Sequence, residues 1–336
     1  MKVAYIISEI SSANGKGDGV RTQAWTWAEG LRRLGVDVSL VGPWDDFDYK
    51  SCDLVHCFSY YAGMHLDLAH LKRKFGVAIA VSPIVDSNRN PLIYRLASYC
   101  DFPKLHMYSP AGSLRRSVEI VDGWFVRSDY EQQYIARAYG IPMQRMHKVM
   151  LSTRLPADNQ DLLREDFALL VSYMPSVRKN VYGLIDAAIK YKFNLVLAGG
   201  PTHISAYEEM LAKIKPYSNI KALGFVSDEQ LSELYHRARV FALPSFYEGV
   251  GLVALEAAAC GCDIVLTNRG APKEYYNGLA YLVDPTSIDE IGRSICDCLH
   301  GKTNQPALKD YICKKHSAEA SAKDLHSEYK KILGKQ

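Results

Sequence analysis

Short runs of β-branched and other apolar residues alternate with longer amphipathic stretches along almost the whole chain. Strands that alternate with helices at this spacing form parallel sheets that are covered by helices on both faces. The sequence therefore predicts an α/β fold with doubly wound sheets, which bind ligands beyond the carboxyl ends of their strands. The predicted strands are residues 3–7, 37–41, 54–57, 78–81, 123–126 and 148–151 in the first half, and 168–171, 194–198, 220–222, 240–242, 263–266 and 280–283 in the second.

The alternation is interrupted at residues 152–161, a stretch with a proline and few apolar side chains. A length of 336 residues suits two domains. We therefore expect one doubly wound domain over residues 1–155 and a second over residues 156–316. Apolar residues recur at helical spacing in residues 317–333, which predicts a final amphipathic helix.

Composition excludes several classes of protein. Apolar residues make up 48% of the chain and charged residues 23%, which is typical of a globular chain and not of a disordered or fibrous one. No apolar run reaches the length of a membrane-spanning helix, and the first run is too short for a signal peptide, so we expect a cytoplasmic protein. The eight cysteines lack zinc-site spacing and predict reduced, partly buried thiols, and no metal site is expected.

Charge is distributed unevenly along the chain. The net charge is +3, and residues 1–155 carry 19 basic against 15 acidic side chains. This excess is too small for a nucleic-acid partner, but it suits a weak contact with an anionic surface. The basic clusters at residues 72–74 and 115–116 are interpreted either as solvated faces or as contacts with anionic lipid, at the inner face of the cell membrane.

The most informative segment is residues 244–256, which follows a predicted strand and opens a predicted helix. Gly249 and Gly251 permit a tight turn and a close approach of the backbone to a ligand. A helix N-terminus at this point favours an anion such as a phosphate group. Glu248 stands before the turn, and Glu256 lies far enough into the helix to accept hydrogen bonds from ribose hydroxyls. The backbone amides expected to face the phosphate belong to Val250, Gly251 and Leu252.

Residues 244–256 resemble the Glu-x7-Glu signature of family 4 glycosyltransferases, which have the GT-B fold. The similarity is nearly continuous over residues 168–333 and looser in the first half of the chain. The resemblance implies two Rossmann-like domains that face a cleft, with the nucleotide-sugar held by the second and the acceptor mainly by the first. It also implies that the last helix, residues 317–336, crosses back to the first domain. Other segments that fit the family are residues 197–201, 223–228, 237–240, 257–263, 270–274 and 277–285.

The implied reaction is a retaining transfer of a sugar from a nucleotide-sugar, such as a UDP- or GDP-sugar, to a glycan or polyprenyl-linked acceptor. The resemblance implies that neither a metal ion nor another cofactor is needed. A role in bacterial capsule or O-antigen synthesis follows from the same analogy. Two alternatives stay open: a non-catalytic protein that binds nucleotide-sugars, and a GT-B sugar-nucleotide epimerase or phosphorylase, whose carboxylate, histidine or pyridoxal-phosphate lysine we cannot assign.

Carried onto this sequence, the resemblance assigns Glu248 to the hydroxyls of the donor sugar and Lys179 to the departing phosphate. A lysine suits that role because it is a compact cation. Glu256 is assigned to the ribose, and Val226 lies near the base. The other predicted donor-binding residues are Gly17 and Gly19 in a glycine-rich loop at residues 14–20, and Arg178, Gly200, Gly249, Val250, Gly251 and Leu252.

Two of the chain's departures from the family pattern concern candidate site residues. The family usually has an arginine five or six residues before the lysine, but Tyr173 and Met174 occupy those positions, which leaves Arg178 as the nearby cation. A histidine that often follows the fourth strand is replaced by residues 82–86, where Asp86 is the candidate substitute. Both departures favour the non-catalytic alternative.

Four features have a structural interpretation beside a functional one. His56, at the end of a predicted strand, is either an acceptor-side residue or a structural histidine. Asp46 and Asp48 resemble an Asp-x-Asp metal motif, but they lie in a polar loop and are interpreted as solvated. Trp25 and Trp27 lie on opposite sides of a predicted helix, so we expect at most one of them in the core. The glycine-rich loop has a mobile surface loop as its alternative.

Overall fold

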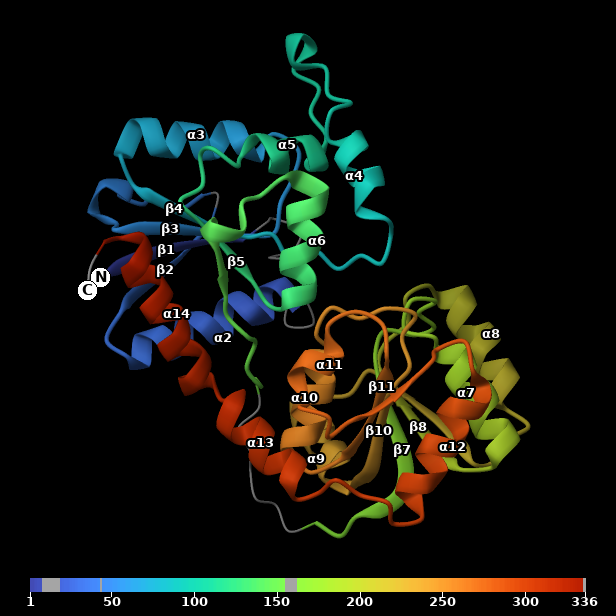
Figure 1. Cartoon of the computed structure of the whole chain (residues 1–336). Coiled ribbons are helices and arrows are strands. Elements are labelled where there is room, and N and C mark those ends of the chain that lie inside the picture. The colour runs from blue at the N-terminus through green and yellow to red at the C-terminus, as the bar shows by residue number, and fades with distance from the viewer. Residues whose placement is uncertain (8–18, 43, 155–161, 335–336) are drawn as a thin grey trace. The chain divides into compact units, whose positions relative to one another are not determined.

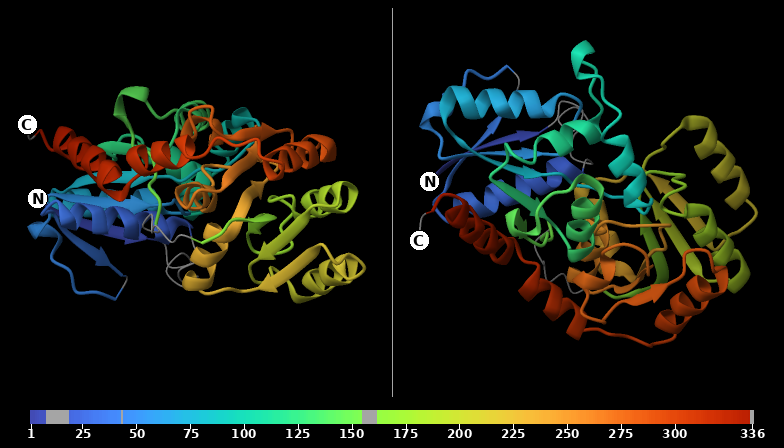
Figure 2. Two further views of the ribbon diagram at one scale, coloured as in Figure 1. Left: turned by 90° about the horizontal axis from the view of Figure 1, so that it is seen from below. Right: turned by 45° about the horizontal axis from the view of Figure 1, so that its top comes forward.

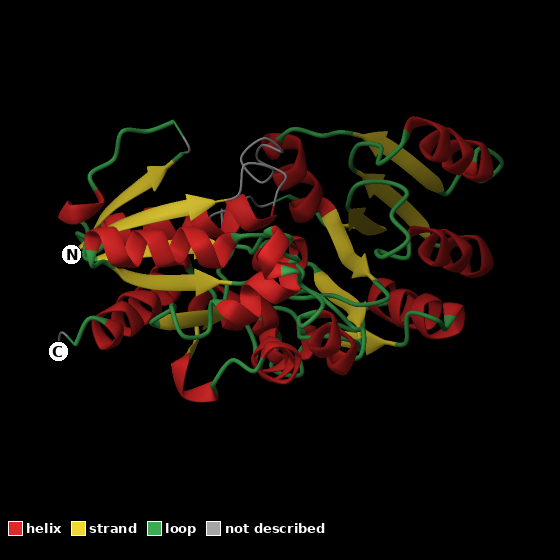
Figure 3. Ribbon diagram, turned by 90° about the horizontal axis from the view of Figure 1, so that it is seen from above, coloured by secondary structure: helices red, strands yellow, loops and turns green. Residues whose placement is uncertain are grey.

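The computed structural model describes residues 1–7, 19–42, 44–154 and 162–334. It divides into two compact units, Met1–Arg154 with Ser317–Gln336, and Leu155–His316. Each unit contains one six-stranded sheet, and every strand pairing in both sheets is parallel. Figure 3 shows the strands of each unit flanked by helices. The prediction of doubly wound parallel sheets is therefore confirmed.

The sheet of the first unit has the strand order β2-β1-β3-β4-β5-β6. Helices α2 and α14 lie side by side on one face, and α3, α5 and α6 lie on the other (Figure 1, Figure 2). The strands are β1 Lys2–Ile7, β2 Asp37–Val41, β3 Leu54–Phe58, β4 Ala78–Ser82, β5 Gly123–Val126 and β6 Met146–Lys148. The helices are α2 Gly19–Arg33, α3 Met64–Phe75, α4 Pro91–Ala97, α5 Pro110–Arg116, α6 Asp129–Tyr139 and α14 Ala318–Ile332, with 3-10 turns η2 Tyr49–Ser51, η3 Pro103–Leu105 and η4 Met143–Arg145.

The sheet of the second unit has the strand order β12-β11-β10-β7-β8-β9. Helices α7, α8 and α12 cover one face, and α9 and α10 cover the other, with α13 packed against α10 (Figure 1). The strands are β7 Glu165–Val171, β8 Asn194–Ala198, β9 Ile220–Gly224, β10 Ala238–Leu243, β11 Asp263–Thr267 and β12 Tyr281–Val283. The helices are α7 Val181–Tyr191, α8 Ile204–Ile214, α9 Asp228–Arg237, α10 Leu252–Ala259, α11 Pro272–Tyr275, α12 Ile288–Leu299 and α13 Ala307–Lys315.

Local sequence explains where several of these elements begin. Serine side chains accept a hydrogen bond from a first-turn amide at the starts of α6, α9, α12 and α14, which satisfies backbone donors that a helix leaves unpaired. At α9 the cap is reciprocal, because Gln230 accepts from the amide of Ser227 while Ser227 accepts from the amide of Gln230. Central strands such as β3 and β11 are buried along their whole length, as expected of parallel strands that are covered on both faces.

One predicted strand was wrong in position. Residues 148–151 were expected to form a strand, but β6 spans Met146–Lys148. Its only neighbour, β5, ends at Val126, which pairs with Lys148. Beyond that point a single further bond forms, from the amide of Val149 to the carbonyl of Val126, at 2.9 Å. Of the apolar side chains that suggested a strand, those of Val149 and Leu151 are buried and that of Met150 is half-buried, but all three lie past the end of the neighbouring strand.

The last helix packs closely on the first. A Cβ atom built on Gly30 of α2 would lie 2.7 Å from the Cβ atom of Ala322 of α14, so glycine lets the two backbones approach. Tyr329 of α14 is fully buried, and its hydroxyl lies 3.0 Å from that of Tyr5 on β1. Within α2, Trp27 is 1% exposed and Trp25 is 51% exposed, so only the first belongs to the core, as predicted.

The packing of α2 on α14 yields a stability prediction. Gly30→Val is expected to lower the free energy of unfolding by about 2 kcal/mol, because the added methyl groups must displace α14. Gly19→Val, in the same helix but with no atom within 4 Å of the added Cβ, is expected to change it by no more than about 0.5 kcal/mol. Urea unfolding followed by tryptophan fluorescence measures both, since Trp27 lies in this unit. Equal losses in the two variants would contradict the packing argument.

Among the described residues, no helix has both the length and the apolar character needed to cross a bilayer.

Candidate functional site

The strand order of the second sheet brings two loops together. After β7 the chain proceeds through β8 and β9 on one side, and then returns to form β10 on the other side of β7. The loops that leave β7 and β10 therefore diverge to helices on opposite faces, which is the place where sheets of this kind bind ligands. These loops are residues 172–180 and 244–251. They are joined by a hydrogen bond of 2.8 Å from the amide of Phe246 to the carbonyl of Arg178.

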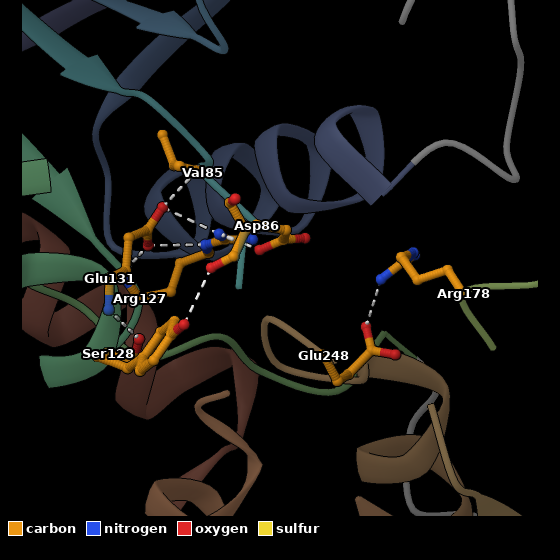
Figure 4. Close-up of polar contacts among 9 residues, drawn as sticks. Val85, Asp86, Arg127, Ser128, Glu131, Arg178 and Glu248 are labelled. Atoms are coloured by element: carbon orange, nitrogen blue, oxygen red, sulfur yellow. Dashed lines mark hydrogen bonds and ion pairs between the residues drawn. The ribbon is translucent and has the colours of Figure 1, made fainter. Parts of the chain in front are cut away.

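Glu248 is the centre of this site, and three side chains surround its carboxylate. Lys179 Nζ lies 2.6 Å from Oε2, Ser245 Oγ lies 3.0 Å from Oε2, and Arg178 Nη1 lies 3.3 Å from Oε1. Figure 4 shows the contact between Arg178 and Glu248. The structure thus brings together the two residues predicted as catalytic, Glu248 and Lys179, and adds Arg178, the cation expected to replace the missing family arginine.

The electrostatics of this cluster explain why it can bind an anion. Glu248 is only 5% exposed, and a buried carboxylate is costly unless it is paired and hydrogen-bonded. Two cations face this one carboxylate, so the cluster carries an excess positive charge. The Arg178 side chain is 37% exposed, and it lies over the ring of Tyr247, with its Cζ 5.6 Å from the ring centre. One side of the arginine therefore stays open to a ligand.

The backbone around Glu248 is fixed by a close approach to the following loop. Glu248 forms a parallel bridge with Gly270, and the amide of Ala271 donates to its carbonyl at 3.3 Å. Gly270 has a φ of +91°, and a Cβ atom there would lie 1.9 Å from the Glu248 carbonyl oxygen. Only glycine fits this position. The bridge therefore positions the carboxylate from the backbone side.

Helix α10 begins directly after this turn. Its N-cap, Gly251, has a φ of 76° and provides no side-chain hydrogen bond. The amides at the start of α10, beginning with that of Leu252, have no capping side chain and carry the positive end of the helix dipole. Behind the turn, the buried hydroxyl of Tyr276 has no hydrogen-bond partner among the described residues. Burial, and then the charge of Glu248, raises the pKa of Tyr276 well above its usual value.

The other predicted donor-binding residues of the second unit lie in the segments that follow β8, β9 and β10. Glu256 is 3% exposed, and the hydroxyl of Tyr235 donates to its Oε2 at 3.3 Å. Gly200 follows β8, and its carbonyl accepts from the amide of Met174 at 2.9 Å. Val226 follows β9 and is half-buried. Gly249 and Val250 belong to the turn before α10. The assignment of these residues to a ribose, a base or a phosphate stays a prediction.

Residues predicted in the first half of the chain lie in the first unit. Gly17 lies outside the described residues, and Gly19 is the first residue of α2. The carboxylate of Asp48 caps η2 by accepting from the amide of Lys50 at 3.0 Å. In the described part of the chain, no group of three or more His, Cys, Asp or Glu side chains is placed to hold a metal ion.

His56 is enclosed in the core of the first unit. It lies in β3 and is fully buried. Its Nδ1 contacts the hydroxyl of Tyr329, and its Nε2 lies 2.9 Å from Ser82 Oγ. Burial lowers the pKa of His56 to about 3, so the ring is neutral near pH 7. Both ring nitrogens are used within the core, as the structural interpretation of His56 expects, and its acceptor-side assignment stays a prediction.

Asp86 belongs to a buried network that the sequence did not reveal. Arg127 Nη2 donates to Asp86 Oδ1 at 2.7 Å and to Glu131 Oε1 at 2.9 Å, and Nε donates to Glu131 Oε2 at 2.9 Å (Figure 4). The Glu131 carboxylate also accepts from the amides of Val85, at 2.7 Å, and Arg127, at 2.9 Å. Arg127 is 6% exposed and Glu131 2%. This network positions the Asp86 side chain, which is one-third exposed, where β4 and β5 end.

Two of these features had a signal in the sequence. Ser128 and Glu131 have the spacing of a helix start, with the serine as N-cap and the glutamate three residues later. That spacing locates α6, but it does not show that Glu131 turns toward Arg127. Gly270 lies in one of the segments that resemble the family, although its spacing to Glu248 does not predict their bridge.

Comparison with known proteins finds a family model that resembles the part of the chain that holds this site. Residues 158–317 match the family model described as glycosyl transferases group 1. O-antigen chain mannosyltransferase B of Escherichia coli is 29% identical over 209 residues, which cover 56% of this chain and 54% of that protein. A GDP-mannose-dependent alpha-(1-6)-phosphatidylinositol monomannoside mannosyltransferase of Mycobacterium tuberculosis (strain ATCC 25618 / H37Rv) is 26% identical over 210 residues, which cover 60% of this chain and 50% of that protein. The chain spans about half the length of these curated relatives.

Solved structures resemble the chain over nearly its whole length. Sucrose-phosphate synthase from Thermosynechococcus elongatus has a TM-score of 0.73 at 16% identity, covering 99% of this chain and 100% of that one. The lipopolysaccharide outer core galactosyltransferase WaaB has a TM-score of 0.67 at 15% identity, covering 97% and 98%. At such low identities the likeness concerns the fold. Residues 158–317 are therefore similar to the glycosyl transferases group 1 family, and the chain has the GT-B fold.

Proposed function

We propose that this protein is a retaining glycosyltransferase that moves a sugar from a nucleotide-sugar to a glycan or polyprenyl-linked acceptor without a metal ion. One observation carries the proposal: Lys179 and Arg178 converge on the buried carboxylate of Glu248 beside the start of α10. Two cations and a helix N-terminus at one point form a site for a diphosphate. The neighbouring carboxylate can accept hydrogen bonds from the hydroxyls of a sugar.

The proposed reaction requires the protein to stabilise negative charge on the leaving group. The bond between the anomeric carbon and the phosphate oxygen breaks, and the acceptor oxygen bonds to the same face of the sugar. The acceptor proton passes to the departing phosphate. Lys179, Arg178 and the amides at the start of α10 offset the negative charge that develops on the diphosphate. In this proposal these groups supply the positive charge that a metal ion would otherwise provide.

The names of the relatives suggest which substrates to test first. Two of them are described as mannosyltransferases, one acting in O-antigen synthesis and one dependent on GDP-mannose. We therefore propose GDP-mannose as the first donor to test, and surface polysaccharide synthesis as the context. A polyprenyl-linked acceptor would bring the protein to an anionic membrane surface.

Binding tests this proposal before the acceptor is known. Thermal unfolding of the full chain is measured with GDP-mannose, other nucleotide-sugars and the free nucleotides, with and without EDTA. One nucleotide-sugar is expected to stabilise the protein by about 2.7 kcal/mol at a hundredfold excess over its dissociation constant. EDTA is expected to leave this shift unchanged.

Three other results would contradict parts of the proposal. A shift that EDTA abolishes would contradict metal independence. No shift with any of these compounds, from a folded sample, would overturn the donor site. A bound nucleotide-sugar that is never transferred to lipid-linked acceptors would favour the non-catalytic alternative, to which the Tyr173 and Met174 substitutions already point.

A further inference from the structure

One stretch of the first unit presents its large apolar side chains to solvent. We call residues 91–107 the α4 arm: it consists of α4 and a turn closed by the bridge between Phe102 and Met107. It projects away from the sheet of its own unit (Figure 1, Figure 2). Seven large apolar residues of the arm are each between 57% and 72% exposed: Leu92, Ile93, Leu96, Tyr99, Phe102, Leu105 and Met107.

The arm is anchored to its unit. Tyr94, on the inner side of α4, packs against Tyr134 and Tyr139 with ring centres 6.2 Å and 6.4 Å apart. Arg115 of α5 lies over the ring of Tyr99, with its Cζ 4.1 Å from the ring centre, and donates from Nε to the carbonyl of Ser98 at 3.2 Å. The fold therefore holds these apolar side chains outward, while it uses other side chains of the arm for packing.

The charge around the arm is positive. Arg89, Arg95 and Lys104 are exposed. Asp101 is the one carboxylate between residues 87 and 107, and its side chain is fully buried. It accepts from the amide and the hydroxyl of Ser109, each at 2.8 Å, and from Arg116 Nε at 3.3 Å. The outer surface of the arm thus combines apolar side chains with cations and no exposed carboxylate.

We propose that the α4 arm inserts into the headgroup region of an anionic lipid bilayer. Exposed apolar patches of this kind mark interaction sites, and apolar side chains flanked by Lys and Arg match the interface of an anionic membrane. A second copy of the chain is a poorer occupant, because it would bring the same cations face to face. The inference concerns the first unit, whereas the donor site described above lies in the second.

The arm fits this role better than the basic clusters that the sequence singled out. Lys72 donates to Asp122 at 2.6 Å and to the carbonyl of Ile120 at 2.8 Å. Arg116 forms an ion pair with Asp101. Arg115 supports the arm by packing on Tyr99. These cations are partly neutralised or structural, whereas Arg95 and Lys104 project from the arm itself.

Co-sedimentation of the full chain with vesicles tests the proposal without any nucleotide-sugar, so its failure is separate from a failure of the proposed transfer. Vesicles of phosphatidylcholine are compared with vesicles that also contain phosphatidylglycerol. Leu96→Ser is expected to lower the partition coefficient roughly fivefold, and adding Leu105→Ser to lower it by more than about tenfold. Arg95→Gln is expected to lower it about fivefold, and only on anionic vesicles.

Ile204→Ser is the matched control, since Ile204 of α8 is 72% exposed, the same fraction as Leu96, but lies in the second unit. It is expected to bind as the wild type does. A direct readout uses Leu105→Trp, whose added fluorescence should be quenched by brominated lipid, while that of Ile204→Trp should not.

Three results would overturn the proposal. The wild type could stay in the supernatant with anionic vesicles. The arm variants could sediment as fully as the wild type, which would assign binding to another surface. Sedimentation velocity could instead reveal a dimer that Leu96→Ser dissociates in the absence of lipid, which would assign the arm to a second copy. Thermal unfolding of each variant confirms that the exposed substitutions leave the fold intact.

Discussion

Lys179→Ala is expected to lower the turnover number by about 10²–10³-fold while leaving the protein folded. Lys179 Nζ lies 2.6 Å from Glu248 Oε2, and its side chain is 16% exposed, so it is a preorganised cation in a partly desolvated site. Removing one such group from the stabilisation of a developing charge costs two to three orders of magnitude in rate. Initial rates with the donor identified by binding measure the effect.

Lys190→Ala provides the control for this variant. Lys190 lies at the end of α7, eleven positions beyond Lys179, and makes an ion pair of the same length, 2.6 Å, with Asp289. Its side chain is 57% exposed, and exposed pairs of this kind contribute little. We expect Lys190→Ala to change the rate by less than about twofold. Equal rates for Lys179→Ala and the wild type would remove Lys179 from the mechanism, whatever the donor.

Arg127→Ala is expected to lower the free energy of unfolding by about 3–5 kcal/mol. The substitution leaves the carboxylate of Glu131, which is 2% exposed, without its guanidinium partner. Removing one member of a buried ion pair is costly because the remaining charge stays buried. Urea unfolding followed by tryptophan fluorescence reports on this unit, since all four tryptophans lie between residues 25 and 124.

Two further variants separate the buried pair from general effects of losing a cation. Lys148→Ala, in the same unit, removes an exposed pair with Asp129, at 2.7 Å, and is expected to cost no more than about 1 kcal/mol. Arg127→Met combined with Glu131→Leu removes both charges and is expected to recover part of the loss. The recovery stays incomplete, because the amides of Val85 and Arg127 lose the carboxylate that they donate to. A loss of less than about 1 kcal/mol in Arg127→Ala would contradict the argument.

The fold was predictable because its signal is local. A short apolar run predicts each strand, and apolar residues at helical spacing predict each helix. Neither signal depends on a residue that is distant in sequence. Local signals failed for one strand, β6, because the end of β6 depends on where its neighbour β5 ends. The run at residues 148–151 is apolar because it is buried, and burial alone does not distinguish a strand from the segment that follows it.

The same distinction between local and distant signals applies to the candidate site. Glu248 and Lys179 were predicted as site residues because both lie in segments that resemble a known family, and the strand order explains why the two side chains meet. The partners of His56 and Asp86 could not be found in this way. Tyr329 contacts His56 across 273 positions of sequence, and Arg127 reaches Asp86 across 41. Such pairings arise from the register of neighbouring strands and from the docking of the last helix, which no short pattern encodes.

The position of α14 in the sequence affects the order in which the two units can complete their folding during synthesis. This helix belongs to the first unit, although the whole of the second unit precedes it in sequence. Domains usually fold as they leave the ribosome, beginning at the N-terminus. In this protein the first unit to be translated is complete only after α14 has been synthesised, because Gly30 packs against Ala322 and His56 Nδ1 contacts Tyr329. The second unit, whose residues are contiguous, can be complete while the first still lacks a helix. A premature stop near the C-terminus would therefore damage the part of the protein that was synthesised first.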